Sequence, residues 1–494
     1  MNHLYCLKTR VVLLLVLIGM PIFIQAQSGY EIKVRVHGLE DTTLLLGHYF
    51  NKSMYPDDTI RVDELGYGVF KGDSTLPGGM YILFLPNRKY VDFMIDKDQR
   101  FTMVTDTTDL FSNMEITGNE VASDFLQYQL FLAKQSQLAG GLRTKKAQAA
   151  TDTEKAAVDE QLARINSNVK SYVDSLIQAN PDNFLGVFVQ ATQPIKVPEP
   201  PKDEAGNITD STFQYRYYRT HYFDNFDVSD PRLLRTPLYE ETVMNYISKV
   251  VPQVPDTLIK EVDWLIEQSR SSDELFRYML ITLFNHFAKS KIMGMDAVYL
   301  HIAEKYYIPE ATWSDEKFLT DLKERVAKAK PTMLGEAAPD FQLVEVPFEH
   351  FIEARNDSAL KHYPHVGQMY NMHDIQSKYT LLVFWESDCG HCKKEIPALY
   401  DLYVNELNNL GLEVVSIHMI GGEEGKAKWV NFINQHELYK WINAWNPYDY
   451  QYKVKYDIQS SPVLFLLDED KKIIAKRIGA DQIADIIRAE EKKN

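Results

Sequence analysis

Cysteine is scarce in this chain: three occur among 494 residues, at Cys6, Cys389 and Cys392. A secreted scaffold that is held together by disulfides needs more cysteines, distributed along its length. A structural zinc site usually takes four ligands, often from two cysteine pairs, and the sequence has no second pair. The scarcity therefore excludes a disulfide-stapled fold and argues against a metal site.

Basic charge is also in deficit, since 53 Lys and Arg residues stand against 69 Asp and Glu, giving a formal net charge of −16. Nucleic acids and anionic lipid surfaces are bound through basic patches, so neither is expected as a partner. A hydrophobic content of 45% and a charged content of 25% are ordinary for globular proteins. The length predicts about three domains.

A long apolar run is found at the N-terminus, where Val11–Ile24 follows Lys8 and Arg10 and precedes Ala26. A basic segment, an apolar segment and a small residue in this order are typical of a secretory signal peptide. The run is shorter than the ~20 residues of a membrane-spanning helix, which favours cleavage over an uncleaved anchor. We predict a signal peptide over residues 1–26 and a location in the periplasm or cell envelope.

The remaining chain shows three patterns of hydrophobic residues. Over residues 28–118, short runs alternate with turn residues, which predicts an all-β sandwich of antiparallel strands. Over residues 119–330 the period becomes helical, most clearly at Asp152–Asn180, and predicts an all-α domain. Over residues 333–494 strands alternate with helices, which predicts an α/β domain. The fold class is therefore multi-domain.

Strands are expected in both the first and the last of these segments. In the first, we expect them around Ile32–Val36 and at Leu44–Tyr49, Tyr67–Phe70, Tyr81–Leu85, Val91–Ile95 and Phe101–Val104. In the last, the continuous apolar runs Leu381–Trp385, Leu412–Ile417 and Val463–Leu467 are typical of buried central strands.

Two cysteines stand where one of these strands meets a helix. Leu381–Trp385 leads directly into Cys389-Gly390-His391-Cys392. The position predicts that Cys389 lies at a helix N-terminus, where unpaired N–H groups and the helix dipole favour a thiolate. A thiolate is the attacking species in disulfide exchange. The spacing allows Cys392 to resolve a mixed disulfide formed by Cys389.

Other uses of a Cys-x-x-Cys motif fit less well. Attachment of c-type haem needs histidine directly after the second cysteine, and this position is Lys393. A purely structural disulfide would close a very small loop and would stabilise the fold little. The motif therefore indicates redox chemistry that needs neither a metal nor an organic cofactor.

Residues 334–488 resemble the TlpA/ResA-like extracytoplasmic thiol–disulfide oxidoreductases of the thioredoxin superfamily. Gly335–Phe341 resembles that family's opening strand motif, and Pro397 stands where the superfamily has its helix-kinking proline. Ser461-Pro462 resembles the cis-proline element that faces the redox pair. The resemblance implies a thioredoxin fold, a cis bond before Pro462 and pairing of the preceding backbone with a bound substrate chain.

The resemblance also extends to Glu395 and Trp385. Glu395 matches an acidic residue that this family places beneath the cysteines, where a partly buried carboxyl relays the proton lost by Cys392. The alternative is an ordinary glutamate in the first turn of a helix. Trp385, which precedes the motif, is expected to pack in the core and to border bound substrate.

Two residues depart from the family pattern. Asp388 stands where tryptophan usually precedes the first cysteine, and it either opposes thiolate formation or caps the helix. His391 stands where proline is common, so that Cys-Gly-His-Cys resembles the centre of protein disulfide isomerase. A histidine there can stabilise the thiolate and make the pair more oxidising.

The first two domains resemble β and helical N-terminal extensions of thioredoxin-like envelope proteins in Gram-negative gut-type bacteria, a resemblance that implies no chemistry of its own. The whole sequence thus predicts a periplasmic enzyme that exchanges dithiol and disulfide with protein substrates. The family resemblance favours net reduction, with electrons supplied by a membrane thiol donor. Oligomeric state and physiological substrate are left open.

Three alternatives accompany this prediction. His391 supports the reverse direction, an oxidase or isomerase. The string Ala338–Phe341 also resembles peroxiredoxin openings, but those enzymes place a lone peroxidatic cysteine after a Thr/Pro-rich loop. The third alternative is a binding or assembly protein whose first 330 residues act while the thioredoxin-like domain is accessory.

Overall fold

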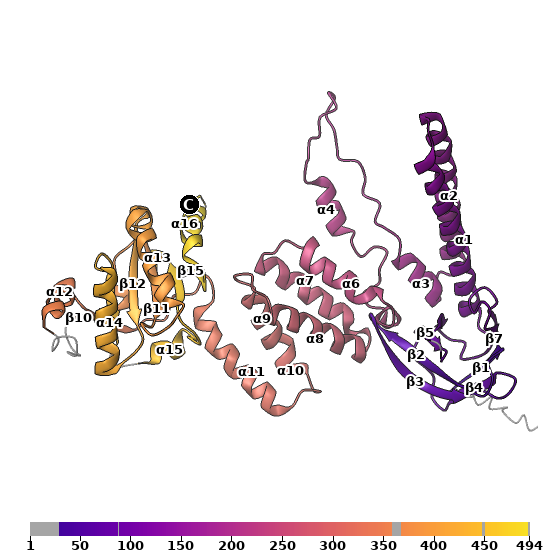
Figure 1. The fold of residues 1–494 in the computed structure, drawn as a ribbon, viewed down its shortest axis with the longest axis horizontal. Coiled ribbons are helices and arrows are strands. Elements are labelled where there is room, and N and C mark those ends of the chain that lie inside the picture. Colours follow the sequence, from indigo (N-terminus) through magenta and orange to yellow (C-terminus); the bar gives the residue numbers. More distant parts are fainter. Residues whose placement is uncertain (1–28, 87, 358–366, 447–449, 493–494) are drawn as a thin grey trace, which may run out of the picture. The chain divides into compact units, whose positions relative to one another are not determined.

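The computed structural model describes residues 29–86, 88–357, 367–446 and 450–492 (Figure 1). They belong to two compact units, one ending at Glu241 and the other beginning at Thr242, with the division inside helix α6 (Leu238–Asn245). The predicted signal peptide lies outside the described residues. Within the described ranges, no helix combines the length and apolar character that crossing a membrane requires.

The first unit contains a β-sandwich of two four-stranded sheets. One sheet has the order β4-β1-β7-β8 and the other the order β3-β2-β5-β6. Buried side chains of both sheets, such as Ile32 and Phe93, share one hydrophobic core. The strands are β1 (Tyr30–His37), β2 (Thr43–Phe50), β3 (Ser53–Arg61), β4 (Tyr67–Gly72), β5 (Gly79–Phe84), β6 (Tyr90–Ile95), β7 (Arg100–Asp106) and β8 (Glu115–Thr117).

The sandwich confirms the predicted all-β fold, but its strands are not all antiparallel. Strands β1 and β7 pair in parallel, with Ile32 opposite Phe101. A parallel pair needs a long crossover, and the strands between β1 and β7 in the sequence provide it. Strand β3, at the edge of its sheet, was not predicted, because Pro56, Asp57 and Asp58 are residues that strands usually avoid. Proline and charge are tolerated at such an edge, where they also discourage pairing with other chains.

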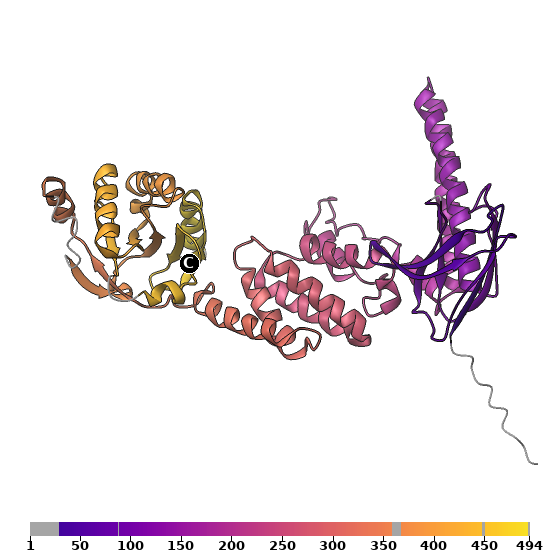
Figure 2. The ribbon, with the colours of Figure 1, turned by 60° about the horizontal axis from the view of Figure 1, so that its bottom comes forward.

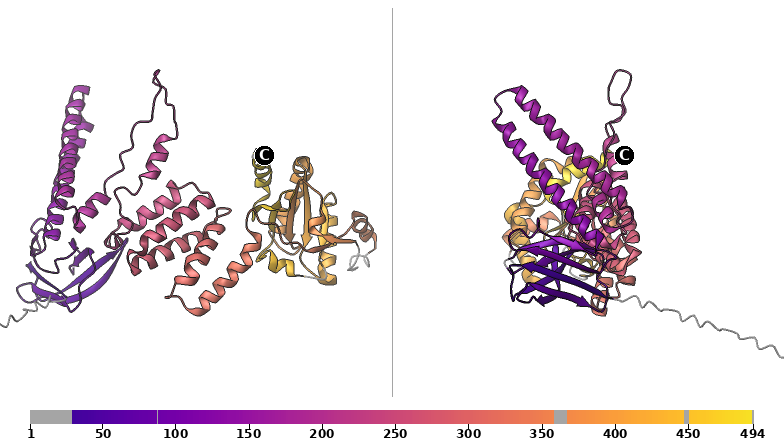
Figure 3. Two further views of the ribbon diagram at one scale, coloured as in Figure 1. Left: turned by 180° about the vertical axis from the view of Figure 1, so that it is seen from behind. Right: turned by 90° about the vertical axis from the view of Figure 1, so that its right-hand side faces the viewer.

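Two long helices follow the sandwich and run side by side as a hairpin (Figure 3). The second begins at a capping box, in which the Thr151 hydroxyl accepts from the Glu154 amide while the Glu154 carboxylate accepts from the Thr151 amide. Rings of Phe131 and Tyr172 stack between the helices at 4.0 Å. The helices of this unit are α1 (Glu120–Gln148), α2 (Asp152–Ala179), α3 (Phe184–Ala191), α4 (Phe213–Thr220), α5 (Pro231–Leu234) and the start of α6.

Asp96, which follows β6, ties the sandwich to two of these helices. Its carboxylate accepts from the Phe184 amide at the start of α3, at 3.1 Å, and pairs with Arg232 of α5, at 3.2 Å. The Arg232 guanidinium also lies over the Phe184 ring, 5.4 Å from its centre. Since both charged side chains are largely buried, this contact fixes how α3 and α5 lie on the sheet.

The second unit begins with helices that bury one face each. Asp263 of α7 links three of their side chains, accepting from Lys305 at 2.8 Å and Tyr306 at 2.9 Å and bonding His301 at 2.6 Å. The elements are α7 (Pro255–Gln268), α8 (Asp273–Ala288), α9 (Asp296–Ile302), α10 (Ile308–Glu310) and α11 (Glu316–Ala329), with π-helical turns at Tyr246–Val250 and Ala303–Tyr307 and 3₁₀ turns at Ser269–Ser271 and Lys330–Thr332.

The C-terminal domain is built on a seven-stranded sheet of order β10-β9-β13-β12-β11-β14-β15, which confirms the α/β fold predicted for it (Figure 2). Its central strands β13, β12 and β11 are parallel, and β14 and β15 complete the sheet in antiparallel pairs. The strands are β9 (Gln342–Glu345), β10 (Gln368–Asn371), β11 (Tyr379–Trp385), β12 (Leu412–His418), β13 (Ile442–Trp445), β14 (Val463–Leu467) and β15 (Ile473–Lys476).

Hydrophobic clusters cover both faces of this sheet. Trp385 packs with Ile396 and Trp429 on one face, while Phe384 packs with Phe341 and Tyr452 on the other. The helices are α12 (Phe348–Asn356), α13 (Cys392–Asn405), α14 (Gly422–His436), α15 (Gln451–Lys455) and α16 (Ile483–Glu491), with 3₁₀ turns at Met372–Asp374, Leu407–Leu410 and Ala480–Gln482.

Strand directions bring three loops of this domain to one edge of the sheet. Because β11 and β12 are parallel, the segments that follow Trp385 and His418 leave at the same edge. Strand β14 runs the opposite way and places Val463 beside Phe384, so that the segment before β14 reaches this edge as well. The cysteine motif, the start of α14 and Ser461-Pro462 are thereby gathered together.

The role of Asp96 in the first unit gives a testable expectation. Replacing it in Asp96→Ala removes the charge-assisted bonds to Arg232 and the acceptor of the Phe184 amide, so we expect the free energy of unfolding of this unit to fall by about 1–3 kcal/mol. Urea unfolding of the protein, followed by far-ultraviolet circular dichroism, measures the change. The exposed Asp98→Ala variant is the control, and equal stability of the two variants would contradict the assignment.

Candidate active site

The two cysteines lie at the N-terminus of α13, as the sequence predicts: Cys392 is its first residue and Cys389 is in the turn that leads into it. Cys389 is partly buried, Cys392 is fully buried, and both are free thiols. The Cys392 amide donates to the Cys389 sulfur, with 3.5 Å between N and Sγ. The Cys389 thiol in turn lies 3.3 Å from the carbonyl oxygen of Ser461. The first sulfur therefore lies between the helix N-terminus and the segment before β14.

Their surroundings shift the two thiol pKa values in opposite directions. Burial acts to raise the pKa of Cys389, but hydrogen bonds from the Cys392 amide and at Ser461 outweigh it and leave this pKa lowered. Burial raises the pKa of Cys392 to about 12. The arrangement thus makes Cys389 the more readily ionised thiol and keeps Cys392 protonated at neutral pH, as a nucleophile and a resolving thiol need.

The residues between and opposite the cysteines are accessible. Gly390 and His391 are exposed, and a side chain at Gly390 would meet nothing within 4 Å, so the backbone does not require glycine there. Ser461 and Pro462 are partly exposed, and the peptide bond between them is cis, which confirms the geometry that the resemblance implied. These four residues are thus at least partly accessible to solvent.

Two predicted site residues are not placed for the roles expected of them. Glu395 is exposed on the first turn of α13, instead of partly buried beneath the cysteines, because the buried face of this helix is taken by Ile396 and Leu399. Trp385 is fully buried, which confirms its predicted packing in the core, and its indole N–H donates to Ser416 at 2.8 Å. This burial leaves Trp385 no surface for a bound substrate and corrects that part of the prediction.

Of the two roles considered for Asp388 from the sequence, the structure excludes the helix cap. Its carboxylate pairs with Lys428 of α14, with 3.0 Å between Oδ2 and Nζ, and caps no amide of α13. Lys428 also pairs with Glu424 one helical turn earlier, at 2.8 Å. An acidic residue next to the nucleophile is thus matched by a base from another element.

Ser387, the preceding residue, is held by a buried histidine at the end of β12. The Ser387 amide donates to His418 Nε2 at 3.2 Å, and the Ser387 hydroxyl lies 3.1 Å from the same nitrogen. The imidazole stacks on Trp429 and meets the edge of Trp385. Burial lowers the pKa of His418 from 6.5 to about 3, so the ring is neutral and able to accept from Ser387.

Sequence reasoning missed both His418 and Lys428. His418 directly follows the apolar run Leu412–Ile417, and that position at the end of a central strand was the available signal. Lys428 lies 40 residues from Asp388 on an exposed helix face, and nothing in the local pattern marks it. Lys428 comes close to Asp388 only through the way α14 packs on the sheet.

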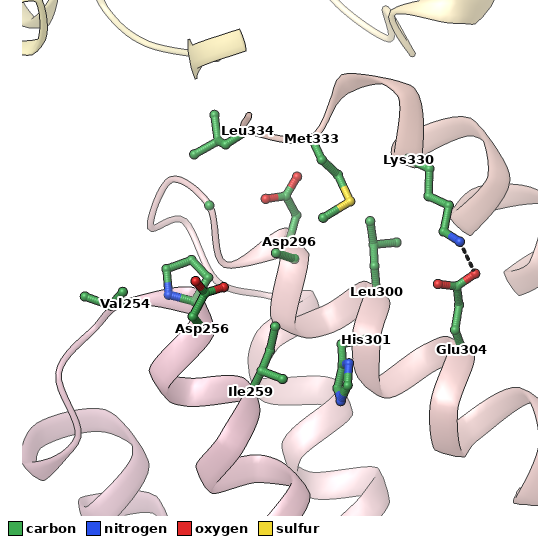
Figure 4. Close-up of a pocket in the computed structure, with 13 residues that line it drawn as sticks. Val254, Asp256, Ile259, Asp296, Leu300, His301, Glu304, Lys330, Met333 and Leu334 are labelled. Carbon is green, nitrogen blue, oxygen red and sulfur yellow. Dashed lines mark ion pairs between the residues drawn. The ribbon is translucent and has the colours of Figure 1, made fainter. Parts of the chain in front are cut away.

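The helical part of the second unit contains a separate hollow of about 480 Å³ (Figure 4). Most of its charged groups are already paired: Glu304 with Lys330 at 2.6 Å, His301 with Asp263, and Asp296 with Lys476. Charged groups that are already paired are less available to bind a ligand or to take part in a reaction. Across the described parts of the chain, no group of three or more His, Cys, Asp or Glu side chains is placed to hold a metal ion.

Comparison with known families divides the chain in three. Residues 334–476 match the AhpC/TSA family. Residues 150–330 match a domain of unknown function (DUF5106), and residues 30–125 match another (DUF4369). The C-terminal domain is therefore a thioredoxin-like domain, preceded by two domains whose families carry no assigned activity.

Among curated relatives, the thiol–disulfide oxidoreductase ResA of Bacillus cereus is 30% identical over 115 residues, covering 23% of this chain and 62% of ResA. ResA of Oceanobacillus iheyensis is 32% identical over 90 residues, covering 18% of this chain and 38% of that protein. The chain thus spans less than two thirds of the length of these relatives.

Solved structures with similarity include a domain of a possible thiol-disulfide isomerase from Cytophaga hutchinsonii. It is 32% identical, covers 33% of this chain and 95% of its own, and has a TM-score of 0.26. A thioredoxin-like protein from Bacteroides caccae is 18% identical, covers 60% of this chain and 99% of its own, and has a TM-score of 0.40.

The opposite shifts of the two thiols predict unequal reactivity. In the reduced protein at pH 7, iodoacetamide should modify Cys389 first and Cys392 at least tenfold more slowly, because thiolate fraction and access control the reaction. Mass spectrometry of tryptic peptides over a time course measures both rates. A Cys389→Ser variant should lose the fast phase, and faster modification of Cys392 would contradict the assignment.

Burial of His418 predicts a loss of stability in acid. The folded protein resists protonating this ring down to about pH 3, whereas the unfolded chain binds the proton below about 6.5. Unfolding therefore takes up a proton between these values, and the free energy of unfolding should fall as pH falls, with a limiting slope of ~1.4 kcal/mol per pH unit.

Urea unfolding at several pH values, followed by tryptophan fluorescence, measures this slope. The His418→Gln variant keeps a side-chain acceptor for Ser387 but has no titrating group. Its stability at pH 7 is lower, and its decline between pH 6.5 and 4 should be shallower than that of the unmodified protein. Parallel profiles for the two proteins would show that His418 does not cause the acid loss.

Proposed function

We propose that this protein, whose C-terminal domain is thioredoxin-like and has ResA oxidoreductases among its relatives, is itself a thiol–disulfide oxidoreductase that acts on protein substrates. The observation that carries the proposal is the pair of oppositely shifted thiols at the start of α13, with the first sulfur beside the Ser461 carbonyl. The catalytic residues are Cys389 and Cys392.

The reaction follows from these positions. The Cys389 thiolate attacks one sulfur of a substrate disulfide, a mixed disulfide forms, and the other substrate sulfur leaves as a thiolate that takes up a proton. Cys392 then loses its proton and attacks Cys389, which releases the second substrate thiol and leaves a Cys389–Cys392 disulfide. Two electrons pass to the substrate, so a dithiol donor must reduce the domain before the next cycle.

Substrate binding is assigned to the exposed surface around Cys389. An extended substrate chain can pair with the backbone at Ser461, next to the cis bond to Pro462, while Gly390 and His391 form the opposite border. Glu395 is retained as a proposed relay only through solvent, since its carboxyl is exposed. The route for the Cys392 proton then includes water.

The proposed location is the periplasm or cell envelope, with a membrane thiol donor upstream and net reduction of clients. The predicted signal peptide over residues 1–26 and the resemblance to extracytoplasmic oxidoreductases support this placement. Residues 28–118 and 119–330 are proposed as separate β and helical domains before the catalytic domain at 333–494.

A second candidate is the reverse direction, oxidation or isomerisation of clients. A specific observation favours it, because the His391 amide is among the groups that lower the pKa of Cys389. A stabilised thiolate favours the reduced form of the pair and makes the disulfide a stronger oxidant. The reduction potential distinguishes the two directions.

The test combines a measurement of the reduction potential of the cysteine pair with trapping of mixed disulfides. Equilibration in glutathione buffers should give a potential near −270 mV for a reductase and nearer roughly −120 to −180 mV for an oxidase or isomerase. A Cys392→Ser variant should accumulate mixed disulfides with a model disulfide protein such as insulin, whereas Cys389→Ser should form none. A pair that does not exchange with glutathione would refute the enzymatic assignment and favour a binding or assembly protein.

A further inference from the structure

The residue before the nucleophile carries a negative charge that disfavours the reaction. Asp388 is exposed and directly precedes Cys389 in the sequence. A carboxylate near a thiol favours the neutral form of that thiol, because two like charges repel. The reactive state of Cys389 is therefore favoured when the Asp388 charge is offset.

Lys428 supplies the offsetting charge from a different element. Its ammonium lies 3.0 Å from Asp388 and 2.8 Å from Glu424, and hydrogen bonds with these two carboxylates raise its pKa. It is consequently a cation throughout the neutral range. The ion pair is between side chains that are each about half exposed, so salt is expected to screen it.

The position of the pair is set by the fold. Helix α14 follows β12, and the last residue of β12, His418, holds Ser387 through two contacts to its Nε2. Strand β12 and helix α14 thus contact two consecutive residues, Ser387 and Asp388, directly before Cys389.

Other charged or titratable groups near the motif come from Glu386, which precedes it, and from the start of α13. His391, Lys393, Lys394 and Glu395 are exposed there, and Cys392 is protonated at neutral pH. They belong to the same helix as Cys392 and point to solvent. Among the described residues with recorded contacts to Asp388, Lys428 is the one that brings a positive charge to its carboxylate.

We propose that Lys428 is a positioning residue that fixes and neutralises the Asp388 carboxylate, and thereby sets the rate and equilibrium of thiol exchange at Cys389. The inference deepens the proposed oxidoreductase function and depends on it. It assigns a role to a residue that touches neither sulfur and acts through Asp388.

The test measures the Cys389 thiol in three variants, from the pH dependence of its alkylation by iodoacetamide at low salt. Lys428→Met should raise the thiol pKa by about half a unit to one unit, which slows alkylation about three- to tenfold below the pKa. Asp388→Asn should lower the pKa. The double variant should lie near the unmodified protein, because both charges are gone.

Salt separates this electrostatic role from a structural one. In Lys428→Met, raising NaCl from 0.02 to 1 M shortens the Debye length from roughly 20 to 3 Å and should restore most of the lost rate. In Asp388→Asn, the same increase in salt should reduce the gain in alkylation rate over the unmodified protein. A structural distortion of the loop would give losses that salt does not reverse and that the double variant does not repair.

The equilibrium provides an independent readout. A three- to tenfold change in the exchange constant with glutathione corresponds to a shift of ~15–30 mV, downward for Lys428→Met and upward for Asp388→Asn. Lys428→Arg keeps the charge and should behave as the unmodified protein. Lys440→Met is the matched control, since Lys440 is exposed before β13, at the opposite edge of the sheet.

The outcomes also distinguish this inference from the proposed function. Unchanged alkylation and potential in both single variants, in a protein that still exchanges with glutathione, would overturn the role of Lys428 and leave the oxidoreductase intact. Loss equal to that of Lys428→Met in the Lys440→Met control would overturn it as well. Failure of the unmodified pair to exchange at all would refute the function on which the inference depends.

Discussion

The active site depends on one contact, the hydrogen bond from the Cys392 amide to the Cys389 sulfur at the start of α13. That amide is unpaired within the helix, so it stabilises a thiolate without losing another partner. The contact forms because β11 is buried along its whole length and therefore has a fixed end, from which the chain turns into the helix. A shift of β11 would displace both sulfurs from Ser461.

Much of this arrangement was predictable from the sequence, because it rests on local patterns. The run Leu381–Trp385 marked β11 and the motif marked the start of α13, while the family resemblance implied the cis bond before Pro462. The sandwich strands with alternating residues were also readable, whereas β3 was not, because its charged and proline residues fit only an edge. At β3 the residue composition disfavours a strand, but the position at the edge of the sheet permits one, and the strand forms.

The contacts that surround the nucleophile were not readable, because they join elements distant in sequence. Asp388 meets Lys428 and Ser387 meets His418 only after β12 has paired with β11 and α14 has packed against the sheet. The prediction that Glu395 is partly buried was wrong for a related reason. The position of a residue in a motif does not indicate which face of the helix packs against the core. Here the apolar neighbour Ile396 takes the buried face.

The two thiols are also coupled through their charges. Besides burial, the hydrogen bond and negative charge of Cys389 are among the causes that raise the pKa of Cys392. When Cys389 enters a mixed disulfide it loses both its charge and its proton-accepting role, so this part of the increase disappears. Cys392 then becomes easier to deprotonate at the stage when it must attack. Formation of the mixed disulfide at Cys389 thereby prepares formation of the Cys389–Cys392 disulfide. No buried carboxyl is needed, because the Cys389 thiolate itself had suppressed ionisation of Cys392.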